Sequence, residues 1–148
     1  VRRASREIER ARRSGRPLAL IMLDVDNFKS INDRFGHQVG DEVLCRLAQL
    51  LRRAVGEEGV VCRYGGEEFA VILPGLDARR AGELAERLRR MVEGHEFPCG
   101  AVRVSMGVAA CPRHALDLSE LIRKADRALY AAKQAGKNRV VVGVAAER

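Results

Sequence analysis

Short apolar runs separated by polar turns recur along the chain and predict several β-strands. The longest apolar run ends abruptly in two aspartates, which is typical of a fully buried strand. Two other β-branched runs flank a Gly-Gly pair, so we expect antiparallel strands joined by a tight hairpin. The expected strands lie at residues 18–26, 60–62, 70–73, 101–109 and 140–142.

Apolar residues also recur at helical spacing in three longer segments, which predicts amphipathic helices that cover the faces of a sheet. The three stripes are Val43, Leu44, Leu47, Leu50 and Leu51; Ala81, Leu84, Ala85, Leu88 and Met91; and Leu121, Ile122, Ala125, Ala128, Leu129 and Ala132. A short polar helix is expected from near Asn27. No internal repeat or second domain is visible, so residues 1–148 are expected to form a single domain.

The composition suits one soluble globular domain with a sizeable core. The chain has 148 residues, of which 47% are hydrophobic and 32% are charged. No apolar run approaches the roughly 18 residues of a membrane span, and the arginine-rich start lacks the apolar stretch of a signal peptide. We expect a cytoplasmic location without direct membrane insertion, and the domain could belong to a membrane-anchored protein.

The formal net charge of +7 raises the possibility of nucleic-acid binding, but most of the excess lies in one segment. Residues 1–16 hold seven arginines and two glutamates in an interspersed pattern. This pattern favours a basic leading helix or a linker from a missing upstream region. With only two tyrosines and four phenylalanines available for stacking, no nucleic-acid partner is expected.

The four cysteines, Cys45, Cys62, Cys99 and Cys111, show neither C-x-x-C spacing nor a disulfide framework. Three of them lie in apolar segments, which favours buried free thiols. Nothing in their spacing pairs them with His37 for a zinc site.

The hairpin region carries the first candidate chemistry. Glu67 and Glu68 follow Gly65 and Gly66 directly and are expected at the first residues of a strand. Glycine allows a bulky ligand to approach the backbone while the carboxylates stand at the rim, an arrangement suited to a polyanion with its metal ions. Taken alone, the same pattern also fits an ordinary hairpin with an acidic rim.

Asp24 and Asp26 end the buried strand and project from one face of an extended chain. Hard carboxylate oxygens suit Mg²⁺ or Mn²⁺, which bind through one or two carboxylates together with substrate phosphates. Asp24 is the better ligand candidate. For Asp26 alone we prefer a structural role, as the cap of the helix that begins near Asn27.

The segment after this strand adds polar candidates, each with a structural alternative. Lys29 lies where an ammonium group could meet phosphate charge, or is a solvated lysine. Asn32 and Asp41 together offer the donor and acceptors that a purine edge requires, or serve a helix-end turn and a first helical turn. His37, in a turn bracketed by two glycines, is more often a turn residue than a ligand.

These residues fall within motifs that resemble a known family. The motifs are Asp24-Val25-Asp26-x-Phe28-Lys29-x-Ile31-Asn32-Asp33, Phe35-Gly36-His37-x-x-Gly40-Asp41, Arg63-Tyr64-Gly65-Gly66-Glu67-Glu68-Phe69, Ser105-Met106-Gly107-Val108-Ala109, and residues 125–138 ending in Gly136-Lys137-Asn138. In this order, over residues 18–142, they resemble a GGDEF domain, the catalytic module of diguanylate cyclases.

The resemblance implies an α/β (α+β) fold with a central, mainly antiparallel sheet flanked by helices, related to nucleotidyl cyclases and the polymerase palm with its ferredoxin-like core. It also implies the reaction, in which two GTP molecules condense to cyclic di-GMP and release two pyrophosphates. Because one such domain binds one GTP, the bond must form across a homodimer of facing domains. An upstream sensory or regulatory domain is expected.

The resemblance also assigns roles in catalysis and metal binding. Asp24, the backbone carbonyl of Val25, and Glu67 would hold Mg²⁺ or Mn²⁺, with Glu68 close by. Glu67 could also serve as the general base. Lys29 would stabilise the developing phosphate charge during in-line attack by a 3′-hydroxyl.

The remaining assignments concern the nucleotide. Asn32 and Asp41 would read guanine, and His37 would lie beside the nucleotide. Lys133 and Lys137 would contact the terminal phosphates.

Two departures from the family pattern change the expectations. Residues 56–59 read Gly-Glu-Glu-Gly where many members carry an Arg-x-x-Asp product-inhibition site, so no such site is expected. The lead-in Asp-x-Leu-Thr-Gly-Leu-x-Asn-Arg is missing, and the chain opens inside an expected helix, which suggests a fragment of a longer protein.

Two alternatives to an active diguanylate cyclase stay open. One is a non-catalytic module that binds GTP or cyclic di-GMP and regulates a partner, although such domains usually show a damaged signature. The other is a purine cyclase that closes one nucleotide on itself, which the Gly-Gly-Glu-Glu-Phe hairpin disfavours.

Overall fold

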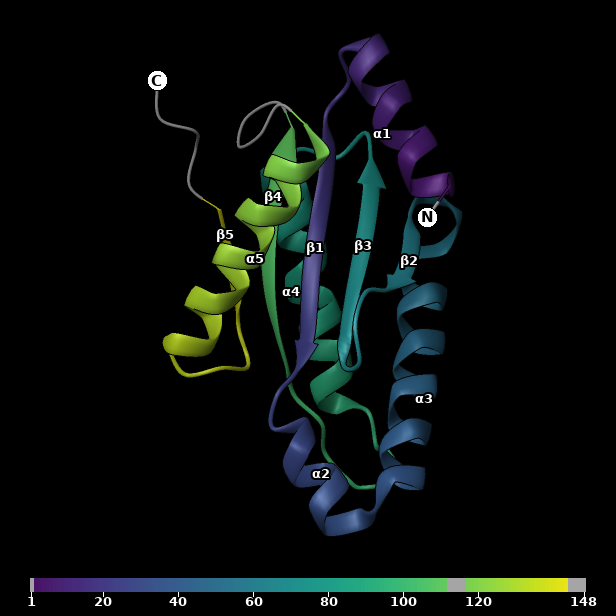
Figure 1. The fold of residues 1–148 in the computed structure, drawn as a ribbon, viewed down its shortest axis with the longest axis vertical. Coiled ribbons are helices and arrows are strands. Elements are labelled where there is room, and N and C mark those ends of the chain that lie inside the picture. The colour runs from purple at the N-terminus through teal and green to yellow at the C-terminus, as the bar shows by residue number, and fades with distance from the viewer. Residues whose placement is uncertain (1, 112–116, 144–148) are drawn as a thin grey trace.

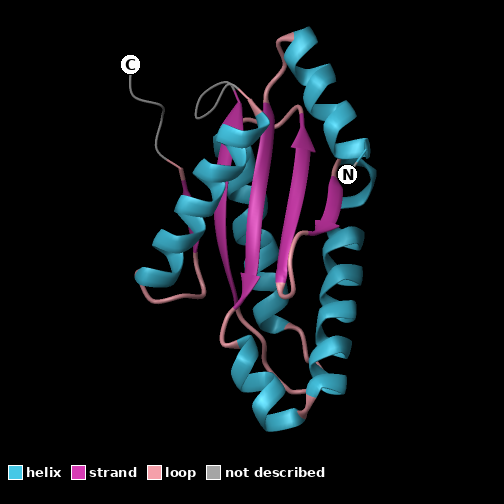
Figure 2. Ribbon diagram, viewed as in Figure 1, coloured by secondary structure: helices cyan, strands magenta, loops and turns pink. Residues whose placement is uncertain are grey.

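The computed structural model describes residues 2–111 and 117–143 and contains a five-stranded sheet in the order β2-β3-β1-β4-β5 (Figure 1). The strands are β1 (Leu18–Val25), β2 (Val60–Arg63), β3 (Glu68–Pro74), β4 (Val104–Cys111) and β5 (Val140–Val142). Neighbouring strands pair antiparallel except β4 and β5, which run parallel. The expected mainly antiparallel sheet flanked by helices is therefore confirmed (Figure 2).

Helices cover both faces of this sheet. The helices of the described chain are α1 (Arg2–Ser14), α2 (Phe28–Phe35), α3 (His37–Val55), α4 (Ala78–Gly94) and α5 (Leu118–Gln134), together with a short 3₁₀ helix, η1 (Gly56–Glu58). The helices α3 and α4 cover one face and α5 covers the other, whereas α2 lies beyond the end of β1. Asp77 and Asp117 cap α4 and α5, because each side chain accepts a backbone N–H at 2.8 Å, from Arg80 and Glu120 respectively. In the described part of the chain no helix is long and apolar enough to span a membrane.

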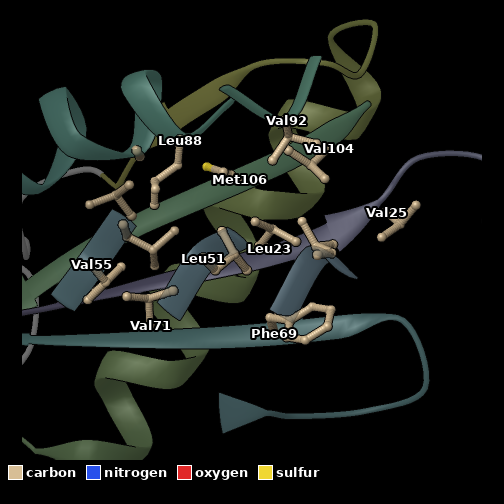
Figure 3. Packing of buried hydrophobic residues seen from close by; sticks show 14 of the residues in the cluster. Leu23, Val25, Leu51, Val55, Phe69, Val71, Leu88, Val92, Val104 and Met106 are labelled. Atoms are coloured by element: carbon tan, nitrogen blue, oxygen red, sulfur yellow. The ribbon is translucent and has the colours of Figure 1, made fainter. Parts of the chain in front are cut away.

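The strand β1 lies at the centre of the sheet and divides the core into two clusters. Its residues 19, 21, 23 and 25 pack with α3 and α4 on one face, and residues 18, 20 and 22 pack with α5 on the other. Residues 18–23 are at most 3% exposed, which confirms the fully buried strand. Figure 3 shows the larger cluster, in which Leu23 and Phe69 from the sheet meet Leu51 of α3 and Leu88 of α4.

The three amphipathic stripes predicted from the sequence form these helix faces. Most of their members are buried, and Leu50, Leu84, Met91 and Ile122 pack at the margins of the two clusters. Fully burying a leucine or valine side chain contributes about 1.5–3 kcal/mol, so the buried members of these stripes stabilise the packing of the helices on the sheet.

Gly107 allows one helix to approach the sheet unusually closely. A Cβ atom at this position would overlap the backbone carbonyl oxygen of Ala125 and the backbone nitrogen of Leu129, both on α5. Because backbone atoms cannot move aside as a flexible side chain can, only glycine permits this contact between β4 and α5. The contact sets the height of α5 above the strands.

Three expectations about the chain's local structure were wrong. The strand predicted at 101–109 runs instead from Val104 to Cys111 and is buried on both faces, because β4 is an inner strand with helices on either side. No cysteine is buried: Cys45 is exposed and the other three are partly exposed, although all four are free thiols. The turn around His37 consists of Gly36 alone, with φ 93°, and His37 already begins α3.

The arginine-rich leading segment does form a helix, but it is more than a solvated linker. Ala11 is buried and Ile8 packs beside it against the smaller cluster. The helix α1 therefore belongs to the folded unit through one apolar face, while Arg10 and Arg13 form exposed ion pairs with Glu7 and Glu9.

Candidate functional site

Carboxylates gather where β1 ends, at one edge of the sheet. In the strand register Asp24 stands opposite Glu68 on β3 and opposite Ser105 on β4. Residues directly opposite each other on paired strands project to the same face, which here is the face covered by α5. That helix brings Lys133 over the strands, with its Nζ 3.1 Å from Asp24 Oδ1.

The glycine hairpin is attached to the same edge. The backbone N–H of Tyr64 donates to the Glu68 carbonyl at 2.9 Å, and the Arg63 Nε–H closes the turn on the Gly66 carbonyl at 3.1 Å. The Val25 N–H donates to the Glu67 carbonyl at 3.3 Å, which ties the hairpin to the end of β1. Glu68 opens β3 as expected, whereas Glu67 lies just before it in the turn.

The crowding of these acids changes their ionisation. Burial raises the pKa of Asp24, although Lys133 opposes this effect. Burial, followed by the Asp24 charge, raises the pKa of Glu67 and Glu68. The Asp24 carboxyl lies within hydrogen-bonding reach of Glu67, so the ionisation of each of these two groups depends on the other.

The interpretation of Asp26 as a helix cap was wrong. Asp26 is buried and accepts hydrogen bonds from Ser105 Oγ at 2.6 Å and from the Asn138 N–H at 2.9 Å. The position before α2 is instead held by Asn27, in the left-handed conformation and without a side-chain cap. The Asp26 carboxylate turns inward because two donors there satisfy its charge, whereas a cap would offer it only exposed amides.

The polar candidates on α2 and α3 lie beside this edge, since α2 directly follows β1 (Figure 1). Lys29, His37 and Asp41 are exposed. Asn32 is half-buried, and its Oδ1 atom is buried without a hydrogen-bond partner among the described residues. A Cβ at Gly40 would overlap this oxygen, so the glycine of α3 lets the amide stand between the two helices.

The loop after α5 brings Lys137 to the start of α2. Lys137 Nζ donates to Asn27 Oδ1 at 2.7 Å. Both residues line a pocket of about 350 Å³ between α2, residues 99–103 and this loop, to which Arg34 and Arg103 also contribute. The structure therefore brings Lys133 and Lys137 toward the carboxylate edge from the same segment.

Sequence reasoning gave no role to Ser105 or Asn138, although both belong to the motifs on which the family resemblance rests. Their partner Asp26 is far away in the sequence, so no local spacing could reveal the contact. Asp126 of α5 was missed as well: its negative charge contributes to the raised pKa of Glu68. The only signal in the sequence that could have indicated the contact with Asp26 was Ser105, a polar residue within an otherwise apolar strand.

The carboxylate edge fits a divalent cation whose coordination is completed by other oxygens. Among the described residues no group of three or more histidine, cysteine, aspartate or glutamate side chains is arranged to hold a metal ion. Asp24 Oδ1, however, is buried, and its charge is only partly offset by the Lys133 ammonium 3.1 Å away. Two carboxylates with neighbouring backbone oxygens are the hard ligands that Mg²⁺ and Mn²⁺ prefer.

Comparison with known proteins gives consistent matches over nearly the whole chain. The family model described as "Diguanylate cyclase, GGDEF domain" matches residues 2–139. A diguanylate cyclase from Vibrio cholerae is 39% identical over 135 residues, which cover 90% of this chain and 42% of that protein. The chain spans between 29% and 42% of the length of the first curated relatives it matches.

Solved structures match equally well. The active GGEEF domain of a diguanylate cyclase from Vibrio cholerae has a TM-score of 0.87 and 37% identity, covering 95% of this chain and 92% of that one. The GGDEF domain of DgcB from Caulobacter crescentus, solved in complex with c-di-GMP, has a TM-score of 0.87 and 34% identity, covering 95% and 83%.

Proposed function

The chain belongs to the GGDEF family of diguanylate cyclase domains, and on that premise we propose that it condenses two GTP molecules into cyclic di-GMP with release of two pyrophosphates. The observation that carries the proposal is the meeting of Asp24, Glu67 and Glu68 with Lys133 at one sheet edge. An acidic edge beside a lysine suits a triphosphate bound together with cations.

Members of this family are generally dependent on a divalent metal. Asp24, the Val25 carbonyl and Glu67 would hold Mg²⁺ or Mn²⁺, which when bound neutralises the charge of the phosphates and lowers the pKa of the attacking hydroxyl. The raised pKa of Glu67 makes its carboxylate more basic than an ordinary glutamate, which supports its second role as general base. Glu68 adds negative charge next to it.

The lysines would act on the phosphates. Lys133 pairs with Asp24 at 3.1 Å, so an incoming phosphate competes for an ammonium that is already held at the site. Lys137 donates a hydrogen bond to Asn27 Oδ1, and Lys29 projects from the first turn of α2. The three ammonium groups together would stabilise the negative charge that develops as pyrophosphate leaves.

Guanine recognition would lie between α2 and α3. The buried Asn32 Oδ1 has no hydrogen-bond partner in the described structure, which is unfavourable unless a ligand donates to it. A guanine edge carries N–H donors that Asn32 and Asp41 can both accept, while adenine lacks the matching ring N–H. His37 at the start of α3 would flank the base.

Two copies of the domain would be needed, because each 3′-hydroxyl attacks the α-phosphate of the other nucleotide and one domain holds one GTP. The active species would thus be a homodimer, at least during turnover. An upstream sensory or regulatory domain would control how often two domains meet.

The test is product analysis by chromatography after a high concentration of the domain is incubated with GTP and Mg²⁺. The proposal expects cyclic di-GMP from the parent and none from Glu67→Gln, with Glu96→Gln, an exposed glutamate, as matched control. Synthesis by Glu67→Gln at the parent rate would contradict the metal assignment. GTP binding without any product, even after forced dimerisation, would favour the non-catalytic binding module instead.

A further inference from the structure

The loop between α5 and β5 has an unusual backbone. Gly136, Lys137 and Asn138 have φ values of 126°, 65° and 47°, so two consecutive residues with side chains adopt the left-handed region. Such residues cost about 1–2 kcal/mol each, less for asparagine, and persist only where the surroundings hold them in place. Something other than local preference therefore fixes this loop.

The side chain of Asn138 is held at both ends by α4. Arg89 Nη1 donates to its Oδ1 at 3.0 Å, and its Nδ2 donates to Glu93 Oε2 at 2.8 Å. Arg89 is itself only 15% exposed in its side chain and is fixed by Glu86, with contacts of 2.7 and 2.8 Å. A side chain with one donor and one acceptor, tolerant of positive φ, is needed here, and asparagine meets all three conditions.

The same loop reaches the candidate site with its other atoms. The Asn138 backbone N–H donates to Asp26 Oδ2 at 2.9 Å, and Asp26 Oδ1 accepts from Ser105 at 2.6 Å. One residue earlier, Lys137 Nζ donates to Asn27 Oδ1 at 2.7 Å. The loop thus connects α4, on one face of the sheet, with Asp26 and Asn27 at the carboxylate edge.

We propose that Asn138 is a positioning residue whose amide, clamped between Arg89 and Glu93, holds the loop so that Lys137 meets the terminal phosphates and Asp26 stays turned inward. Asn138 touches no reacting atom. Its phosphate role rests on the proposed function, because it matters there only if Lys137 binds a nucleotide.

The decisive variant is Asn138→Gly, because glycine keeps the left-handed backbone and removes only the clamp. Arg90→Gln is the matched control: Arg90 lies next to Arg89 on α4 and pairs with Glu86, and no hydrogen bond or ion pair joins it to the described loop. Affinity is measured for 3′-deoxy-GTP, which lacks the attacking hydroxyl and cannot condense, and for GMP, which lacks the terminal phosphates. Thermal unfolding shows whether each variant is folded.

Loss of one fixed charged contact predicts that Asn138→Gly weakens 3′-deoxy-GTP binding about tenfold, while GMP binding stays within about twofold of the parent. In a Lys137→Ala background, Asn138→Gly should weaken 3′-deoxy-GTP binding by less than about a further twofold, because both substitutions remove the same contact between Lys137 and the phosphates. Arg90→Gln should change neither affinity. Equal losses for the two nucleotides, or additive losses in the double variant, would overturn the proposal.

Amide hydrogen exchange in the absence of nucleotide tests independently whether Asn138 holds the loop. Exchange at positions 136–139 should quicken about tenfold in Asn138→Gly while that of β1 is unchanged. Unchanged exchange in the loop would show that no clamp exists. If the parent fails to bind 3′-deoxy-GTP, the proposed function fails, and this exchange measurement still decides whether Asn138 holds the loop.

Discussion

Lys133 on α5 places its Nζ 3.1 Å from Asp24 Oδ1 at the end of β1. The ammonium group at the carboxylate edge therefore comes from α5, which lies about a hundred residues after β1 in the sequence. Its position depends on how α5 packs on the sheet. The ion pair offsets part of the unfavourable burial of Asp24, since Lys133 lowers the pKa that burial raises.

The height of α5 gives a first prediction. Gly107→Ala should destabilise the domain by about 1–3 kcal/mol, because its Cβ overlaps the α5 backbone and the helix must shift. The shift should also move Lys133 and reduce synthesis in the protein that remains folded. The matched control is Gly94→Ala, at the end of α4, where a Cβ meets nothing within 4 Å. Denaturant unfolding and initial rates measure both effects, and equal stability of the two variants would contradict this packing argument.

The raised pKa of Glu68 predicts a pH-dependent gain in stability. A carboxyl whose pKa is higher in the folded state stabilises the fold when the pH lies below its pKa in the unfolded state. This stabilisation is lost as the pH rises through its pKa in the folded state. At neutral pH Glu68→Gln should thus unfold at a higher denaturant concentration than the parent. Its free energy of unfolding should be greater by at most about 1 kcal/mol, because solvent screens a half-exposed group. The difference should shrink as the pH falls below the ordinary glutamate value of 4.5. A difference that grows toward low pH would show the opposite sign of the shift.

Guanine selectivity is expected to depend on the pair Asn32 and Asp41. Asn32→Ala or Asp41→Ala should reduce the preference for GTP over ATP about tenfold or more, because each would remove a group that we propose accepts a hydrogen bond from guanine alone. Competition of GTP and ATP for binding measures this preference directly. Weaker binding of both nucleotides in equal proportion would indicate a general structural role instead.

Product inhibition should be weak. Residues 56–59, Gly-Glu-Glu-Gly, lack the arginine and aspartate of the Arg-x-x-Asp pattern, and residues 56–58 form the acidic 3₁₀ helix η1. Cyclic di-GMP is a dianion, which this acidic turn does not favour. Initial rates at increasing cyclic di-GMP should therefore show inhibition only at high concentrations. Strong noncompetitive inhibition would reveal a second site built from other residues.

Local patterns were sufficient for most of the fold. The buried strand at residues 18–23, the glycine hairpin and the three apolar stripes follow from periodicity, because an amphipathic element carries its orientation in its own sequence. The first departure came at β4, whose extent depends on neighbours on both sides. The cysteines departed for the same kind of reason: Cys62, for example, lies on β2, at the edge of the sheet, where burial is incomplete.

The sequence by itself determined which chemical groups are present: carboxylates at the end of a buried strand, two glutamates beside a glycine turn, lysines at and just beyond the end of a helix, and their order along the chain. Only the tertiary structure decided which of these groups meet. Asp26 turns toward Ser105 and Asn138 rather than capping α2, Lys133 pairs with Asp24, and Asn138 is held by α4. These contacts join residues that are distant in the sequence, and burial makes an unpaired charge so unfavourable that the whole fold, rather than the local chain, selects each partner.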